Sequence, residues 1–188
     1  MPNKIPQREA LRLAKRLLAE DLSVKGYSIL PNSCWMQGPP DVVARAEAAE
    51  ALAKLGADAA PAVPGLIRLL ADENVCCGED DCVHPWQRTV ADSAAAALVQ
   101  IGRPAVPALI EALASPDNNV RWKAATVLGV IGAAAASAAP ALAARVRAEP
   151  QGVTRDLMAR ALRKVRAKAA RRRAAGGSKR SRSRGKRA

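Results

Sequence analysis

The chain has 188 residues, of which 49% are hydrophobic but only 2% aromatic, with no phenylalanine. A core must therefore be built from alanine, leucine, valine and isoleucine, and alanine at this density favours helix because it loses no side-chain entropy there. The net charge of +13 belongs to the C-terminal end, since residues 160–188 contain 14 Lys or Arg and no acid while residues 1–159 are nearly neutral.

The sequence gives no sign of a membrane-spanning protein or of a secreted one. We find no apolar run of about 18 residues, the length that a membrane span needs. The N-terminus has basic residues but lacks the unbroken apolar stretch of a secretory signal. We therefore expect a cytoplasmic protein in a compartment that keeps thiols reduced.

Residues 1–40 are expected to hold an N-terminal capping helix, over "QREALRLAKRLLAE", and then a loop with Cys34 and Trp35. Arg8, Arg12 and the pair Lys15 and Arg16 form a basic stripe on that helix. Such a stripe is more typical of a solvated face than of a binding site.

The next part of the chain repeats itself. Three segments, "RAEAAEALAKLG", "ADSAAAALVQIG" and "RWKAATVLGVIG", align on Gly56, Gly102 and Gly132 without a gap. Their shared apolar positions lie three and four residues apart, which defines one face of a helix, and the glycine follows where a helix C-cap is expected. The aligned columns are Ala49, Ala95 and Ala125; Leu52, Leu98 and Leu128; and Leu55, Ile101 and Ile131.

A second segment follows each glycine after a short Ala/Pro loop. Its proline suits a first helical turn, where the missing N–H would have no partner anyway. Each repeat is therefore helix, turn, helix, and because neither helix can bury its apolar stripe alone, the repeats must stack. We expect helix pairs at 41–55 and 62–71, 88–101 and 105–114, and 119–131 and 139–148. The aligned residues are Pro64, Pro107 and Pro140; Leu66, Leu109 and Leu142; and Leu70, Leu113 and Val146.

These repeats, over roughly residues 41–165, resemble HEAT repeats of the short bacterial type, the kind also seen in phycobilisome-lyase-like proteins. The third, "SPDNNVRWKAATVLGVIG", matches best, with Asp117 and Arg121 where the family has an Asp and an Arg that tie neighbouring repeats together. Arg45 falls in the Arg121 column, whereas Ala91 departs from it. The resemblance implies an all-α solenoid of stacked antiparallel helix pairs, and it is specific for fold rather than function.

A further helix, "VTRDLMARALRKVRA", is expected to cap the repeats at their C-terminal end. It places Arg155, Ala159, Leu162 and Val165 in the matching columns. It has Arg166 where the glycine would be.

A Cys/His-rich insert interrupts the repeats at 73–88. The second and third glycines are 30 residues apart but the first and second are 46 apart, so about 16 residues, "ENVCCGEDDCVHPWQR", are inserted between two repeats. The segment 30–40 precedes the first repeat in the equivalent place. Because neighbouring helices pack about 8–10 Å apart, the cysteines and the histidine of both segments can converge on one edge. The residues are Cys34, Cys76, Cys77, Cys82 and His84.

Three interpretations of this cluster remain open. Thiolates and an imidazole are the ligands of a structural zinc site, and four of the five candidates would complete a closed tetrahedron. The cysteines can also form a disulfide or redox pair, or stay unliganded. A catalytic zinc fits less well, because the sequence has one histidine and no His-x-x-x-His pair.

Candidate partner-binding residues are the three tryptophans and the outward positions of the second helices. In a chain so poor in aromatics the tryptophans can form a contact surface, or each can pack over its own loop. The second helices carry mixed charge, which is a weak signal. The candidates are Trp35, Trp86 and Trp122 together with Arg68, Glu111 and Arg145.

Residues 166–188, with a Gly-Gly break and a basic low-complexity run, are expected to be disordered alone. Such a run is typical of contact with RNA or DNA phosphates, and acidic proteins, anionic membranes or a purely solubilising role are the alternatives. The basic residues are Arg166, Lys168, Arg171, Arg172, Arg173, Lys179, Arg180, Arg182, Arg184, Lys186 and Arg187.

The sequence thus favours a non-catalytic HEAT-repeat scaffold that binds a protein partner and, through its tail, nucleic acid of either kind or another polyanion. It has no glycine-rich phosphate loop and no nucleophile elbow. The alternative is a HEAT-like enzyme acting on nucleic acid, similar to DNA glycosylases, or a bilin-lyase-like protein.

Overall fold

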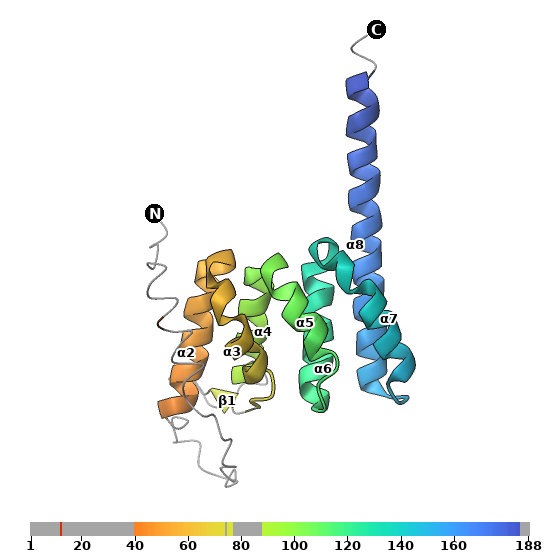
Figure 1. Ribbon diagram of the computed structural model, residues 1–188. Helices are drawn as coiled ribbons and strands as arrows, with labels where there is room; N and C mark the ends of the chain where they lie inside the picture. The colour runs from red at the N-terminus through yellow and green to blue at the C-terminus, as the bar shows by residue number, and fades with distance from the viewer. Residues whose placement is uncertain (1–11, 13–39, 74, 77–87, 185–188) are drawn as a thin grey trace. The chain divides into compact units, whose positions relative to one another are not determined.

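The computed structural model describes Arg12, residues 40–73, 75–76 and 88–184 (Figure 1). The fold is all-α and of the α-solenoid class. The chain divides into two compact units, residues 1–108 and 109–188, which are described separately below.

The N-terminal unit holds the first repeat and most of the second. Its elements are α2 (Pro40–Leu55), the 3-10 helix η1 (Gly56–Ala62), α3 (Val63–Leu69), α4 (Val90–Ile101), η2 (Arg103–Ala105) and the start of α5 (Val106–Ala112). The first helices of the two repeats, α2 and α4, pack against each other, and α3 packs on α4. Leu52, Leu66 and Leu98 are fully buried, so the aligned apolar columns form the core.

The C-terminal unit holds the end of α5, α6 (Asn118–Ile131), η3 (Gly132–Ala138), α7 (Ala139–Ala148) and α8 (Val153–Arg184). α8 packs against α6, η3 and α7, so it closes the core as the predicted capping helix. Its buried residues are Met158, Ala161 and Val165, whereas Leu162 is half-buried. Ala161 approaches α6 so closely that a Cβ added at Gly129 would lie 3.0 Å from its Cα. The aligned columns predict Leu162 in the core of this helix, but the structure buries Ala161 there instead. The core face of α8 therefore differs from the prediction by one residue.

The helix ends follow the glycine and proline signals of the sequence. Gly56, Gly102 and Gly132 have φ values of 56°, 71° and 68°, a left-handed conformation that favours glycine. All six predicted repeat helices are present, and their ends lie within two residues of the expected ones. One start signal was missed: Thr89 and Asp92 form a reciprocal capping box that begins α4 at Val90.

The insert leaves and rejoins the repeats through a short antiparallel pair. β1 (Val75–Cys76) pairs with β2 (Arg88–Thr89), with Val75 opposite Thr89. Along the chain this pair lies between α3 and α4. β1 also contacts α2.

The C-terminal tail differs from the sequence prediction. Residues 166–184 continue α8 as one helix of 32 residues, so the expected disorder is wrong for this part of the tail. Extending an existing helix avoids the cost of nucleation, and Ala, Arg and Lys are good helix formers. Gly176 and Gly177 each weaken the helix by about 1 kcal/mol relative to alanine, which is less disruptive than a proline.

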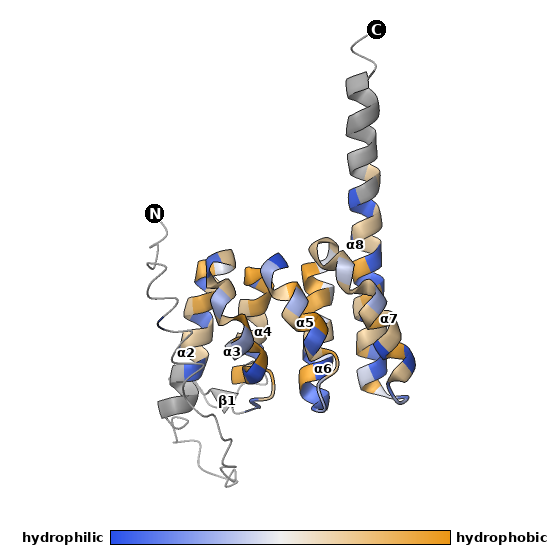
Figure 2. Cartoon of the chain, viewed as in Figure 1, coloured by the Kyte–Doolittle hydropathy of each residue, from blue (hydrophilic) through white to orange (hydrophobic). Residues whose placement is uncertain are grey.

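The prediction that the chain has no apolar run long enough for a membrane span also needs correction. The segment Asn118–Ala148 contains an 18-residue window with a mean hydropathy of 1.9, enough in length and composition for a membrane span. Val90–Ile101 with Arg103–Ala112 passes the same test as a bent pair. In the structure the first segment is three elements, because the chain turns through η3, where Ala135 departs from helical geometry. Leu128 and Leu142 of this segment lie fully buried in the core, and Figure 2 shows hydrophobic residues along α6.

Candidate functional site

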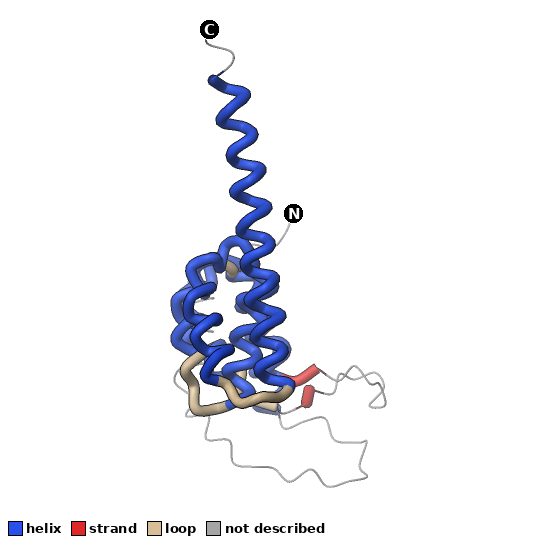
Figure 3. The backbone as a smooth tube through the Cα atoms, turned by 90° about the vertical axis from the view of Figure 1, so that its right-hand side faces the viewer, coloured by secondary structure: helices blue, strands red, loops and turns tan. Residues whose placement is uncertain are grey.

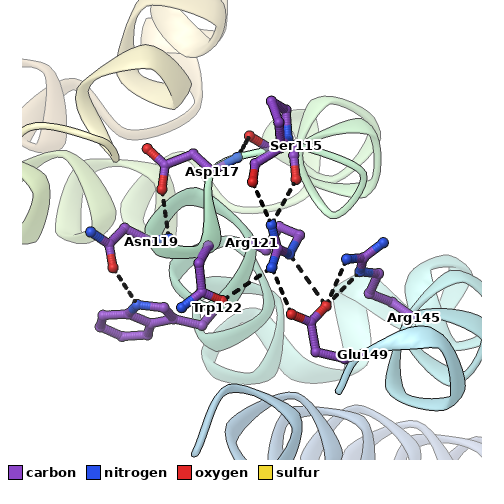
Figure 4. Close-up of polar contacts among 9 residues, drawn as sticks. Ser115, Asp117, Asn119, Arg121, Trp122, Arg145 and Glu149 are labelled. Carbon is purple, nitrogen blue, oxygen red and sulfur yellow. Dashed lines mark hydrogen bonds and ion pairs between the residues drawn. The ribbon is translucent and has the colours of Figure 1, made fainter.

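A buried carboxylate at the end of α7 holds two arginines (Figure 4). Glu149, 5% exposed, accepts hydrogen bonds from Arg121 Nη2 at 2.6 Å and Nε at 3.2 Å and from Arg145 Nε at 2.8 Å. Arg145 Nη2 also forms an ion pair with Glu149 at 2.7 Å. We call these three residues the Glu149 clasp. Hydrogen bonds from Arg121 first, and then from Arg145, hold the pKa of Glu149 below its ordinary value despite its burial.

Arg121 also reaches the turn between α5 and α6. Its Nη1 donates to the carbonyl oxygens of Ser115 at 3.1 Å and Pro116 at 2.7 Å, and its Nη2 donates to Asn118 Oδ1 at 3.2 Å. With the two bonds to Glu149, all five N–H groups of the guanidinium have acceptors. Arg121 therefore ties the end of the second repeat to the end of the third, as the family resemblance implied.

Asp117 acts differently from the expectation. Its Oδ1 accepts from the backbone N–H of Asn119 at 2.7 Å, so it caps its own helix, α6. Its own N–H donates to Ser115 Oγ at 3.2 Å. The inter-repeat tie comes from Arg121 with Glu149, and the sequence analysis did not identify Glu149.

The other repeats explain the pattern of the Arg121 column. In the first repeat Arg45 Nε lies 2.9 Å from Asp72 Oδ2, and both side chains are largely buried. In the second repeat Ala91 replaces the arginine and Ser115 stands where Asp72 stands in the first. Arginine and acid are thus lost together, so no charge is left buried alone.

Of the residues predicted to bind a partner, the structure shows only some to be exposed. Arg68 and Glu111 are exposed. Arg145 belongs to the Glu149 clasp and its side chain is 29% exposed, so it is not a free surface charge. Trp122 is half-buried, donates from Nε1 to Asn119 Oδ1 at 3.2 Å, and lies 5.2 Å from Lys123 Nζ, so it packs on its own helix. Trp35 and Trp86 lie outside the described residues.

The predicted metal residues are mostly beyond the part of the chain that is described. Cys34, Cys77, Cys82 and His84 lie outside it, and Cys76 is described by its backbone in β1. Among the described residues, no group of three or more His, Cys, Asp or Glu is placed to hold a metal ion. The zinc site remains a prediction.

The predicted nucleic-acid residues lie along α8. Arg166, Arg171 and Arg172 are exposed. Arg173, Lys179, Arg180, Arg182 and Arg184 occupy positions on the helical backbone, and Lys186 and Arg187 lie outside the described residues. Arg160, Arg163 and Lys164, which belong to the same basic region 160–188 but precede the predicted residues, are also exposed on this helix.

Lys168 has a structural contact that the sequence did not suggest. Its Nζ donates to the carbonyl oxygen of Val130 at 3.0 Å, one of the last carbonyls of α6. Its side chain lies over Gly132, where an added Cβ would be 2.2 Å from Lys168 Cδ. A cation at a helix C-terminus is favourable, so Lys168 fixes α8 on the end of α6.

Comparisons with known proteins bear on the repeats. The family model for HEAT repeats matches residues 86–163, from just before α4 to the first third of α8. No curated protein and no solved structure matches the chain. The matched range includes the second and third repeats and the whole Glu149 clasp. Residues 86–163 of this chain are therefore HEAT repeats.

Proposed function

We propose that the protein is a non-catalytic interaction module in which the repeats bind a protein partner and α8 binds nucleic acid. The observation that carries the second part is the charge of α8: from Arg160 to Arg184 it has 12 basic residues and no acid. HEAT repeats generally mediate protein interactions, and stacked helical repeats offer extended binding surfaces, which supports the first part.

The charge density of α8 suits a phosphate backbone. Twenty-five residues of helix span about 37 Å at 1.5 Å per residue. Duplex DNA carries about one negative charge per 1.7 Å, so a helix of this kind meets a dense row of phosphates over its whole length. Figure 2 shows hydrophilic residues along the part of α8 whose side chains are described. Exposed cations without neighbouring acids are the sequence-independent contacts that such binding needs.

The buried acids support a structural rather than a catalytic core. Asp72 and Glu149 are the buried carboxylates of the described residues, and each forms an arginine ion pair. Glu149 in particular has both oxygens bound and a lowered pKa, so it is a poor general base at neutral pH. No described residue favours the alternative of an enzyme acting on nucleic acid.

The experiment is charge neutralisation in the full-length protein. Replacing Arg171, Arg172, Arg173, Lys179, Arg180, Arg182 and Arg184 by glutamine keeps good helix formers and removes seven charges. The control replaces three exposed basic residues outside α8, Lys54, Arg103 and Arg147, by glutamine.

Binding is followed by fluorescence anisotropy on a labelled 24-base-pair duplex. At about 0.1 M salt we expect the seven-fold variant to bind about 100-fold more weakly or worse, since several phosphate contacts are lost, and the control to change by less than about threefold. Equal affinity of the seven-fold variant and the wild type would show that α8 is not the binding element.

A further inference from the structure

The tail is a helix that extends beyond its packing partners. α8 is held by Met158, Ala161 and Val165 in the core and by Lys168 on the end of α6. Positions 169–184 continue the same helix for about 24 Å. Figures 1 and 3 both show this second half of α8 extending past α6 and α7. A rigid basic helix binds polyanions in a different way from a flexible basic chain.

Helical periodicity places most of the basic positions of α8 in two rows, whereas Arg163 and Arg172 fall between the rows. At about 100° per residue, the positions of Lys164, Arg171, Lys179 and Arg182 fall on one side of α8. Those of Arg166, Arg173, Arg180 and Arg184 fall on roughly the opposite side. From position 167 onward the outward positions between the rows are held by small residues, of which Ala167, Ala170 and Ala174 are exposed. Arg163, at the same angle one turn earlier, is the basic residue on this face.

Building on the proposed function, we propose that α8 binds B-form duplex DNA by lying in its major groove, with each basic row on the phosphates of one strand. The groove is about 12 Å wide and a helix with its side chains is about 10–12 Å across. The two rows face the two backbones that wall the groove. The small residues between the rows leave room for the helix to approach the base edges.

Other nucleic acids fit this arrangement less well. The major groove of duplex RNA is deep and too narrow for side chains to enter. Single strands are bound by stacking their bases on aromatic side chains, and α8 has no aromatic residue. Two opposed rows are also of no advantage on a single backbone, because one row faces away from it. The structure therefore favours duplex DNA.

The test compares three labelled probes of one sequence: a 24-base-pair DNA duplex, the same duplex in RNA, and the single DNA strand. The full-length wild type is expected to bind duplex DNA at least about tenfold more tightly than either of the others. Ala174→Pro keeps every charge but breaks the helix in its middle. It is expected to lose at least about tenfold in affinity for duplex DNA and less than about twofold for the single strand. Ala174→Ser is the matched control.

A second pair of variants tests the rows. Replacing Arg173, Arg180 and Arg184 by glutamine, or Arg171, Lys179 and Arg182, removes three charges from one side each. Both variants are expected to lose comparable affinity for duplex DNA. Circular dichroism and thermal melting of each variant check that the repeats stay folded.

Equal affinity of the wild type for all three probes, together with no effect of Ala174→Pro, would overturn the groove-bound helix while leaving nucleic-acid binding by the tail intact. Absence of binding to every probe at low salt would overturn both the groove-bound helix and the proposed function.

Discussion

Replacing Glu149 by glutamine tests whether the Glu149 clasp holds the third repeat together. The glutamine has nearly the same shape, but one carboxylate oxygen becomes an NH₂ group that points at a guanidinium. Glu149 accepts three arginine hydrogen bonds of 2.6 to 3.2 Å and forms a further ion-pair contact with Arg145 Nη2. Hydrogen bonds to charged groups contribute about 1.5–3 kcal/mol each. The glutamine oxygen retains some of them, and Arg145 is partly exposed to water. We expect a loss of about 2–3 kcal/mol in the free energy of unfolding.

Urea unfolding measures this loss locally. The chain has three tryptophans, so Trp35→Phe with Trp86→Phe leaves Trp122, one residue from Arg121, as the fluorescent reporter. With a urea dependence of about 1–3 kcal/mol per molar, the midpoint is expected to fall by about 1 M or more. The matched control is Glu111→Gln, an exposed carboxylate whose replacement is expected to change stability by less than about 0.5 kcal/mol.

The effect of Glu149 also has a predicted pH dependence. The pKa of Glu149 is lower in the folded chain than its ordinary value of 4.5, so its ionised form stabilises the fold. This contribution is fully present above pH 4.5 and is lost as the pH falls through the folded value. The difference between wild type and Glu149→Gln is therefore expected to narrow at acid pH. An unchanged urea midpoint at neutral pH would refute the clasp as a stabilising tie.

Two further predictions concern the core and the insert. Leu128→Ala removes a fully buried side chain and is expected to lower the free energy of unfolding in urea by about 2–5 kcal/mol. Val130→Ala, at a residue that is 46% exposed, is expected to lower it clearly less. Similar losses in the two variants would contradict the assigned core face of α6. Elemental analysis is expected to find one zinc ion per chain, held by Cys34, His84 and two of Cys76, Cys77 and Cys82. Removing the zinc with a chelator is expected to expose residues 72–88 to protease while the helices persist. Metal-free protein with four freely titrating thiols would contradict the zinc site.

The repeat helices were predictable because their signals are local. Glycines at left-handed φ, prolines at helix starts and apolar positions three and four apart each act within a few residues. Leu52, Leu98 and Leu128 are fully buried for that reason. The fourth helix has no terminal glycine to fix its alignment, which is why its core face was placed one position away, on Leu162 rather than Ala161.

Contacts between distant residues were less predictable. Arg121 was identified, but its partner Glu149 is 28 residues away and one position off the alignment with Asp72. The helical tail was missed because Gly176 and Gly177 suggested a break, whereas the packed start of α8 had already nucleated the helix. Lys168 looked like one more tail charge until its bond to the Val130 carbonyl placed it on α6.

The salt dependence of binding tests most directly the claim that α8 binds nucleic acid. The affinity of the full-length protein for duplex DNA is measured by anisotropy from about 50 to 200 mM salt, and the logarithm of the association constant is plotted against that of the salt concentration. If about six of the basic residues of α8 contact phosphates, the slope is expected to be near −5, at about −0.9 per contact. A slope near zero, or no measurable affinity at the lowest salt, would contradict the claim.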